Sequence, residues 1–194
     1  LLSNPTHVYA KEPTVFYSLA QIMKQSDGSI FIHTPYNICN DWMYESFQEI
    51  CTRHPDTVLM TNSAANNGNP FGASDYLENK GRLLDIGLTI YEYEGGVSYH
   101  GKSISVGDRL SIVGSFNMDM RSAYLDTELM LVIDSEAVNR QLREYMQLYE
   151  AESVKVLDEE NYEVPEGVKR QEFREGMEWK IKVLKYYRWY RFLM

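Results

Sequence analysis

The chain has 194 residues, of which 44% are hydrophobic and 24% charged, and its formal net charge is −9 at pH 7. This composition is ordinary for a globular domain, and the acidic balance argues against a general nucleic-acid binder, because phosphate backbones are held by an excess of Lys and Arg. The sequence has no run of about 18 apolar residues, so we expect no helix that spans a membrane by itself. Its first residues show neither an initiator methionine nor a signal peptide, which indicates a piece of a longer protein.

Helix-like and strand-like segments alternate over the first 150 residues. Apolar side chains at helical spacing predict helices at 15–23, at 42–53, from Ser74 or Asp75 to about 87, and at 137–150. Asn40 or Asp41 is expected to cap the second helix, since either side chain accepts hydrogen bonds from free backbone amides. Short apolar runs predict strands at 29–33, 57–61, 88–93, 103–106, 110–113 and 128–133, the last of them buried.

This order of elements predicts an α/β domain with a mixed β-sheet. Gly107 and Asp108 separate two predicted strands and are a signal for a tight hairpin turn, so the sheet is not purely parallel. The stretch 62–72 is rich in Asn and Gly and is expected to be a flexible loop outside the core. Cys39 and Cys51 fit two isolated thiols and predict neither a disulfide framework nor a metal site.

The composition changes after residue 150, which suggests a boundary between a domain at 1–150 and an appended segment at 151–194. Residues 151–178 are acidic and form an expected linker, whereas the tail 179–194 has no acidic residue. Its five basic residues are Lys180, Lys182, Lys185, Arg188 and Arg191. With its many aromatic rings, the tail fits either a helix lying on anionic lipid or a C-terminal helix packed on the domain with its basic residues in solvent.

One cluster of polar residues carries candidate chemistry, and it occurs once in the chain. His100 can attack phosphorus or move a proton, and Lys102, two residues on, is expected on the same face of a strand, where it neutralises phosphate oxygens. Ser115 and Asn117 offer a hydroxyl and an amide to the same oxygens. Glu128 is expected behind the imidazole of His100, where it would fix the tautomer.

Each part of this cluster also has an ordinary structural interpretation. The His-x-Lys pair fits the exposed face of a strand, and Gly114-Ser115-Phe116-Asn117 fits a turn that ends a strand. Glu128 fits the start of a surface strand. The combination, rather than any single part, predicts a phosphodiester site.

The combination resembles the phospholipase D superfamily, and more specifically its cardiolipin synthase and phosphatidylserine synthase branch. The resemblance rests on H-x-K, a short hairpin, G-S-x-N and then 119–122, Asp-Met-Arg-Ser. The segments 34–36 and 61–63 are also similar to those that precede the motif in that branch. The resemblance covers roughly residues 5 to 150 and implies a mixed sheet between helical layers, built as one of two similar halves.

The resemblance also implies a mechanism. In this superfamily one histidine forms a covalent phosphohistidine, the other protonates the departing alcohol, and neither a metal nor another cofactor is required. This chain resembles the C-terminal half, so His100 is assigned the general acid/base role, with Lys102, Ser115 and Asn117 as phosphate-binding residues. The position of the family's motif aspartate falls on Gly107. Either Asp108, one residue later, is expected to replace that aspartate, or Gly107 marks a weakened or inactive site.

Three functions follow as hypotheses. The first is a phosphodiesterase or phosphatidyltransferase of phospholipids, at a membrane surface touched by the tail, whose second motif lies upstream or in a second chain. No nucleic acid is expected as its partner. The second is a single-motif nuclease that pairs two identical chains, and the third is a non-catalytic module that binds lipid or a partner. The acidic body argues against the nuclease, and Gly107 is the only support for the third.

Overall fold

The computed structural model describes residues 1–6, 12–184, 186 and 191. Within them, nine strands form one sheet in the order β1-β9-β7-β6-β2-β4-β5-β10-β11. Their bounds are β1 (Leu2–Ser3), β2 (Ile30–His33), β4 (Val58–Asn62), β5 (Thr89–Tyr93), β6 (Ser103–Val106), β7 (Leu110–Gly114), β9 (Leu129–Asp134), β10 (Ser153–Val156) and β11 (Tyr162–Glu163). A separate two-stranded ladder joins β3 (Asn37–Ile38) to β8 (Met118–Asp119).

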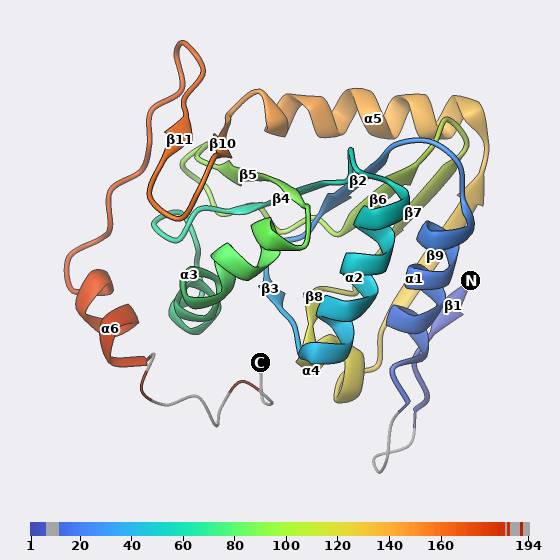
Figure 1. Cartoon of the computed structure of the whole chain (residues 1–194), viewed down its shortest axis with the longest axis horizontal. Helices are drawn as coiled ribbons and strands as arrows, with labels where there is room; N and C mark the ends of the chain where they lie inside the picture. The colour runs from blue at the N-terminus through green and yellow to red at the C-terminus, as the bar shows by residue number, and fades with distance from the viewer. Residues whose placement is uncertain (7–11, 185, 187–190, 192–194) are drawn as a thin grey trace.

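Helices cover both faces of this sheet, as the family resemblance implied. Their bounds are α1 (Thr14–Gln25), α2 (Asp41–Arg53), α3 (Pro70–Asp85), α4 (Met120–Tyr124), α5 (Glu136–Glu150) and α6 (Met177–Leu184). In Figure 1, α5 runs across one face, and α1, α2 and α3 lie on the other. The second predicted helix begins as expected, because the Asn40 side chain accepts a hydrogen bond from the Met43 amide at 3.0 Å.

The sheet is mixed, which confirms the predicted fold class. β2, β4 and β5 are parallel, whereas β6, β7 and β9 are antiparallel to their neighbours. Ile32 lies opposite Leu59 on one side and Ile104 on the other, and all three side chains are buried in the main core beneath α1 and α2. Burial of such side chains is the main favourable term in folding and fixes the register of the strands.

Residues 62–72 differ in two ways from the flexible loop that the sequence predicts. α3 begins at Pro70 rather than at 74 or 75, because Asn69 caps it by accepting a hydrogen bond from the Phe71 amide at 3.1 Å. Asn66 and Asn67 are buried rather than outside the core. The Asn66 amide donates to the Ser63 hydroxyl and its Nδ2 donates to the Tyr93 carbonyl, so both nitrogens have a partner.

β9 and β10 also depart from the sequence predictions. β9, which the sequence predicts to be buried, is exposed on one face, where Leu129 and Leu131 keep 50% and 46% of their surface accessible. The predicted acidic linker starts with a strand of the main sheet, since β10 pairs with β5 through Ser153 opposite Tyr93. The sheet therefore continues past the predicted boundary at residue 150.

The C-terminal segment packs on the domain. α6 contacts α3, where Ile181 is buried with Ala73 and its carbonyl accepts a hydrogen bond from the Ser74 hydroxyl at 3.1 Å. Arg191 pairs with Asp75 and donates to the Cys39 carbonyl at 2.9 Å. Residues 185 and 188, two of the five basic positions of the tail, lie outside the described residues. No helix among the described residues has the length and apolar character needed to cross a membrane.

Candidate functional site

The β6–β7 hairpin brings the two parts of the sequence motif together. The strands are antiparallel, with Ser103 opposite Val113, and the Gly114 amide donates to the Lys102 carbonyl at 3.3 Å. Because the open ends of a hairpin lie side by side, residues 100–102 before β6 meet residues 114–117 at the end of β7. His100 and Lys102 themselves precede the strand rather than lie in it.

An open hollow of about 660 Å³ lies at this end of the hairpin. It is lined by His100, Lys102, Gly114, Ser115, Asn117, Asp126, Thr127 and Glu128. Five of the six predicted site residues are therefore brought together. The sixth, Asp108, lies in the turn at the other end of the hairpin and lines a different pocket, with Arg109 and Asp134. The structure does not bring Asp108 to the hollow.

The hairpin turn explains why glycine stands where the resemblance implies an aspartate. Gly107 has a φ of +57°, a region that favours glycine, and its amide donates to the Ser29 carbonyl at 2.9 Å. A Cβ at this position would lie 2.7 Å from the Asp27 carbonyl oxygen. An aspartate at 107 therefore does not fit this turn unless the backbone moves.

His100 and Lys102 are in direct contact. The Lys102 Nζ lies 2.9 Å from His100 Nδ1 and donates to the His100 carbonyl at 2.7 Å. Burial lowers the pKa of His100 below its usual 6.5, and the Lys102 ammonium lowers it further. Burial also lowers the pKa of Lys102, while the carboxylates of Glu128 and Asp119 act in the opposite direction. At neutral pH the hollow thus presents a neutral imidazole beside a cation.

We expect the variant Lys102→Met to raise the pKa of His100 toward 6.5, because the substitution removes the repulsion between the ammonium and the imidazolium. In the unchanged chain, the neutral imidazole should form as the pH rises through a midpoint below 6.5. An NMR titration of the His100 ring measures both midpoints. Lys24→Met is the matched control, since Lys24 pairs with Glu49 at 2.7 Å on α1 and α2. An identical midpoint in Lys102→Met would contradict the account.

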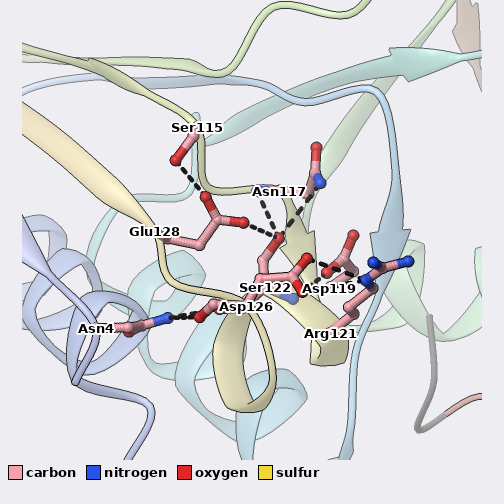
Figure 2. Close-up of polar contacts among 8 residues, drawn as sticks. All are labelled: Asn4, Ser115, Asn117, Asp119, Arg121, Ser122, Asp126 and Glu128. Carbon is pink, nitrogen blue, oxygen red and sulfur yellow. Dashed lines mark hydrogen bonds and ion pairs between the residues drawn. The ribbon is translucent and has the colours of Figure 1, made fainter. Parts of the chain in front are cut away.

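Glu128 makes contacts other than the predicted one with His100. Figure 2 shows its carboxylate between two serine hydroxyls. Ser115 donates to one carboxylate oxygen, and Ser122 donates to the other at 2.8 Å. Ser115 in turn accepts a hydrogen bond from the Leu129 amide at 3.1 Å. The described partner of the His100 ring nitrogens is instead Lys102.

The structure adds residues that sequence reasoning did not assign to the site. Asp126 and Thr127 line the hollow because α4 ends at Tyr124 and the following loop returns to β9. Asn4, from the N-terminal segment, donates to the Ser122 carbonyl at 2.6 Å and to the Asp126 carbonyl at 3.2 Å. No local pattern signals the role of Asn4 here, since its partners near the hollow, Ser122 and Asp126, lie more than a hundred residues away.

Tyr36 is a further neighbour of the hollow. Its ring lies edge-on to that of His100, with 6.0 Å between the ring centroids. Tyr36 precedes β3, and β3 pairs with β8 through Asn37 opposite Met118. The segment 34–36 is thus placed beside the motif. The only feature of the sequence that points to this segment is its similarity to the corresponding segment of the cardiolipin synthase branch. Among the residues described, no three His, Cys, Asp or Glu side chains gather as a group able to hold a metal ion.

A mixed sheet between helical layers is the architecture of phospholipase D-like domains. The fold is similar to that of phosphatidylserine synthase from Haemophilus influenzae, with a TM-score of 0.70 and 14% identity over 96% of this chain and 46% of that one. It is also similar to Nuc, a phospholipase D family member from Salmonella typhimurium, with a TM-score of 0.60 and 14% identity over 74% of this chain and 91% of that one. At such identities these likenesses show the fold alone.

The chain belongs to the family described as "Cardiolipin synthase, PLD-like domain", which matches residues 19–149. Cardiolipin synthase A from Erwinia tasmaniensis is 45% identical over 73 residues, 38% of this chain and 15% of that protein. Cardiolipin synthase A from Yersinia pseudotuberculosis is 42% identical over 80 residues, 41% of this chain and 16% of that protein. The matched segment spans about a sixth of the length of these curated relatives.

Proposed function

We propose that this chain supplies one motif of a two-motif site that cleaves or transfers the phosphodiester of phospholipids. The observation that carries the proposal is the hollow itself, where His100 and Lys102 face Ser115 and Asn117. Imidazole, ammonium, hydroxyl and amide are the groups that move a proton and stabilise the charge of a phosphodiester in its transition state. Similarity to cardiolipin synthase A and to the fold of a phosphatidylserine synthase supports a phospholipid as the substrate class.

In the first step, a histidine of the second motif attacks phosphorus through a ring nitrogen. The bond from phosphorus to the alcohol oxygen breaks, and that oxygen takes a proton from the imidazolium form of His100. Lys102 compensates the negative charge on the non-bridging oxygens, and the Asn117 amide donates a hydrogen bond to them. Ser115, whose single hydroxyl proton goes to Glu128 in the chain without substrate, donates to the phosphate once that hydroxyl turns from Glu128 to the substrate. The products are a phosphatidyl group covalently bound to the second histidine and a free alcohol.

In the second step, His100 acts as the base. Its neutral imidazole accepts the proton of a water molecule or a second alcohol, whose oxygen attacks phosphorus and displaces the second histidine. Water gives hydrolysis, and an alcohol gives transfer. The lowered pKa of His100 suits this step, and the negative phosphate bound beside the ring raises that pKa for the first one.

The proposal is tested on the intact protein with glycerophospholipid vesicles, by following release or exchange of the headgroup with ³¹P NMR. We expect turnover without added metal, and exchange when a primary alcohol is present. Cleavage of single- or double-stranded DNA with no action on the vesicles would replace this function by the nuclease. Binding to vesicles without turnover would replace it by a lipid-binding module.

We further propose that the tail touches anionic lipid through its exposed aromatic rings. Trp179 and Tyr186 keep 68% and 79% of their surface accessible, and Lys180 is exposed beside them. Such rings favour the headgroup region, and lysines favour anionic lipid.

The double variant Trp179→Ala and Tyr186→Ala is expected to reduce binding to phosphatidylglycerol vesicles by roughly tenfold, measured by co-sedimentation. Tyr17→Ala is the control, because Tyr17 is 55% exposed on α1, which lies apart from α6 in Figure 1. Equal binding by the double variant and the unchanged chain would contradict a membrane contact through these rings.

A further inference from the structure

We infer that Ser122 is a positioning residue, which uses the Glu128 carboxylate to hold the phosphate-binding side chains in place. The inference rests on the proposed function and assigns a role that sequence reasoning did not give to this serine. Ser122 is fully buried, at 0% exposure, and does not line the hollow. It therefore acts through other residues and not by touching substrate.

The hydroxyl of Ser122 uses its full hydrogen-bonding capacity. It donates to Glu128 at 2.8 Å and accepts from the backbone amide of Asn117 at 3.2 Å and from Asn117 Nδ2 at 3.3 Å. A serine hydroxyl has one donor and two acceptor sites, so its orientation is fixed by these three bonds. Figure 2 shows the resulting chain of contacts from Ser115 through Glu128 and Ser122 to Asn117.

The rest of the residue is held as firmly as its hydroxyl. The Ser122 amide donates to the Asp119 side chain at 2.6 Å, which caps α4, and its carbonyl accepts from Asn4 at 2.6 Å. Asp119 is itself buried, and β8 ties its backbone to Ile38. The hydroxyl that donates to Glu128 and accepts from Asn117 thus belongs to a residue whose amide and carbonyl are also held.

One carboxylate consequently sets the spacing of both phosphate-binding side chains. Glu128 receives the Ser115 hydroxyl on one oxygen and the Ser122 hydroxyl on the other. An asparagine amide nitrogen carries two N–H donors, so a bond from Asn117 to Ser122 leaves the second for a phosphate oxygen. Loss of the Ser122 hydroxyl removes the bonds to Glu128 and to Asn117 and leaves the bond between Ser115 and Glu128 in place. Preorganised donors such as the Asn117 amide lose most of their effect when they are free to turn away.

The test compares Ser122→Ala with Ser153→Ala in the intact protein. Both serines are fully buried. The Ser153 hydroxyl, in β10, donates one hydrogen bond to the Tyr149 carbonyl of α5 at 2.8 Å. We expect Ser122→Ala to lower kcat by roughly 10- to 100-fold, since it removes a hydrogen bond to a charged group. Ser153→Ala should leave kcat unchanged, and Ser122→Thr, which keeps the hydroxyl, should recover most of the loss.

A double-mutant cycle separates positioning from general destabilisation. If Ser122 acts through Asn117, Ser122→Ala lowers kcat little further in a chain that already carries Asn117→Ala. Fully additive effects, or equal losses in Ser122→Ala and Ser153→Ala, would overturn the inference.

A second measurement keeps the inference separate from the proposed function. In the chain without ligand, the side-chain amide resonances of Asn117 should move in Ser122→Ala and stay in place in Ser153→Ala. Absence of phospholipid turnover in the unchanged protein would overturn the proposed function alone, whereas unmoved Asn117 resonances would overturn the positioning role whatever the activity.

Discussion

The variant His100→Ala is expected to lose phospholipid turnover by roughly 10²- to 10⁴-fold, the usual contribution of a general acid/base. Alanine can neither protonate the departing alcohol nor accept the proton of the incoming one. Lys102 cannot take over, because an ammonium has no lone pair to accept a proton. The hollow keeps its phosphate-binding groups in this variant, so KM should change far less than kcat.

The effect of His100→Ala is separated from general damage by His54→Ala. His54 follows α2 and lines a pocket with Gly28 and Asp56, not the hollow. This control should retain full turnover. Equal kcat in His100→Ala and the unchanged protein would remove His100 from the mechanism.

The variant Gly114→Ala is expected to destabilise the fold by about 3 kcal/mol and to disable the site. Gly114 ends β7 opposite Met130 of β9, where the two backbones approach closely. A Cβ there would overlap the Leu129 carbonyl oxygen and lie 2.9 Å from Met130 Cα. Backbone atoms of a paired strand cannot turn aside as a flexible side chain can, so the end of β7 must move.

Movement at Gly114 reaches the site directly. Ser115 is held by the Leu129 amide and the Glu128 carboxylate, and both partners lie on the strand end that the new methyl group would displace. Urea denaturation measures the stability, and turnover measures the site. Gly68→Ala is the matched control, since a Cβ there would lie an ordinary 3.8 Å from Ser98 Oγ. Full stability and activity in Gly114→Ala would contradict the close approach of β7 and β9.

The hairpin and most elements could be predicted from the sequence because their signals are local. Gly107 and Asp108 mark the turn between two apolar runs, and an antiparallel pair then brings His100 beside Ser115 without further information. The cap at Asn40 is equally local, since its partner is three residues away. The same hairpin places Asp108 at the end opposite the hollow. The spacing of residues along the motif does not reveal this separation.

The contacts of Glu128 could not be predicted, because they depend on elements that are distant in sequence. Whether a carboxylate at this position meets His100 or two serines is decided by the register of β9 against β7 and by the length of α4. The contact of Asn4 could not be predicted for the same reason. Asn4 reaches the site only because β1 pairs with the start of β9.

Tertiary packing also determines the structures that the tail and the predicted linker adopt. The basic aromatic composition of the tail left two interpretations open, and α6 packs on α3 through Ile181 while Trp179 stays exposed. β10 has the sequence Ser-Val-Lys-Val in an acidic segment, without an apolar run, and its place in the sheet comes from pairing with β5. Pairing with a neighbour, rather than intrinsic preference, stabilises such a strand.

Binding of a substrate phosphodiester in the hollow can be tested by a crystal structure of the protein with tungstate. Tungstate is a tetrahedral oxyanion of the shape and charge of phosphate, and its position is read from anomalous density. We expect one tungstate in the hollow, within hydrogen-bond distance of Lys102 Nζ and of the Ser115 and Asn117 side chains. A hollow without anomalous density at saturating tungstate would contradict such binding.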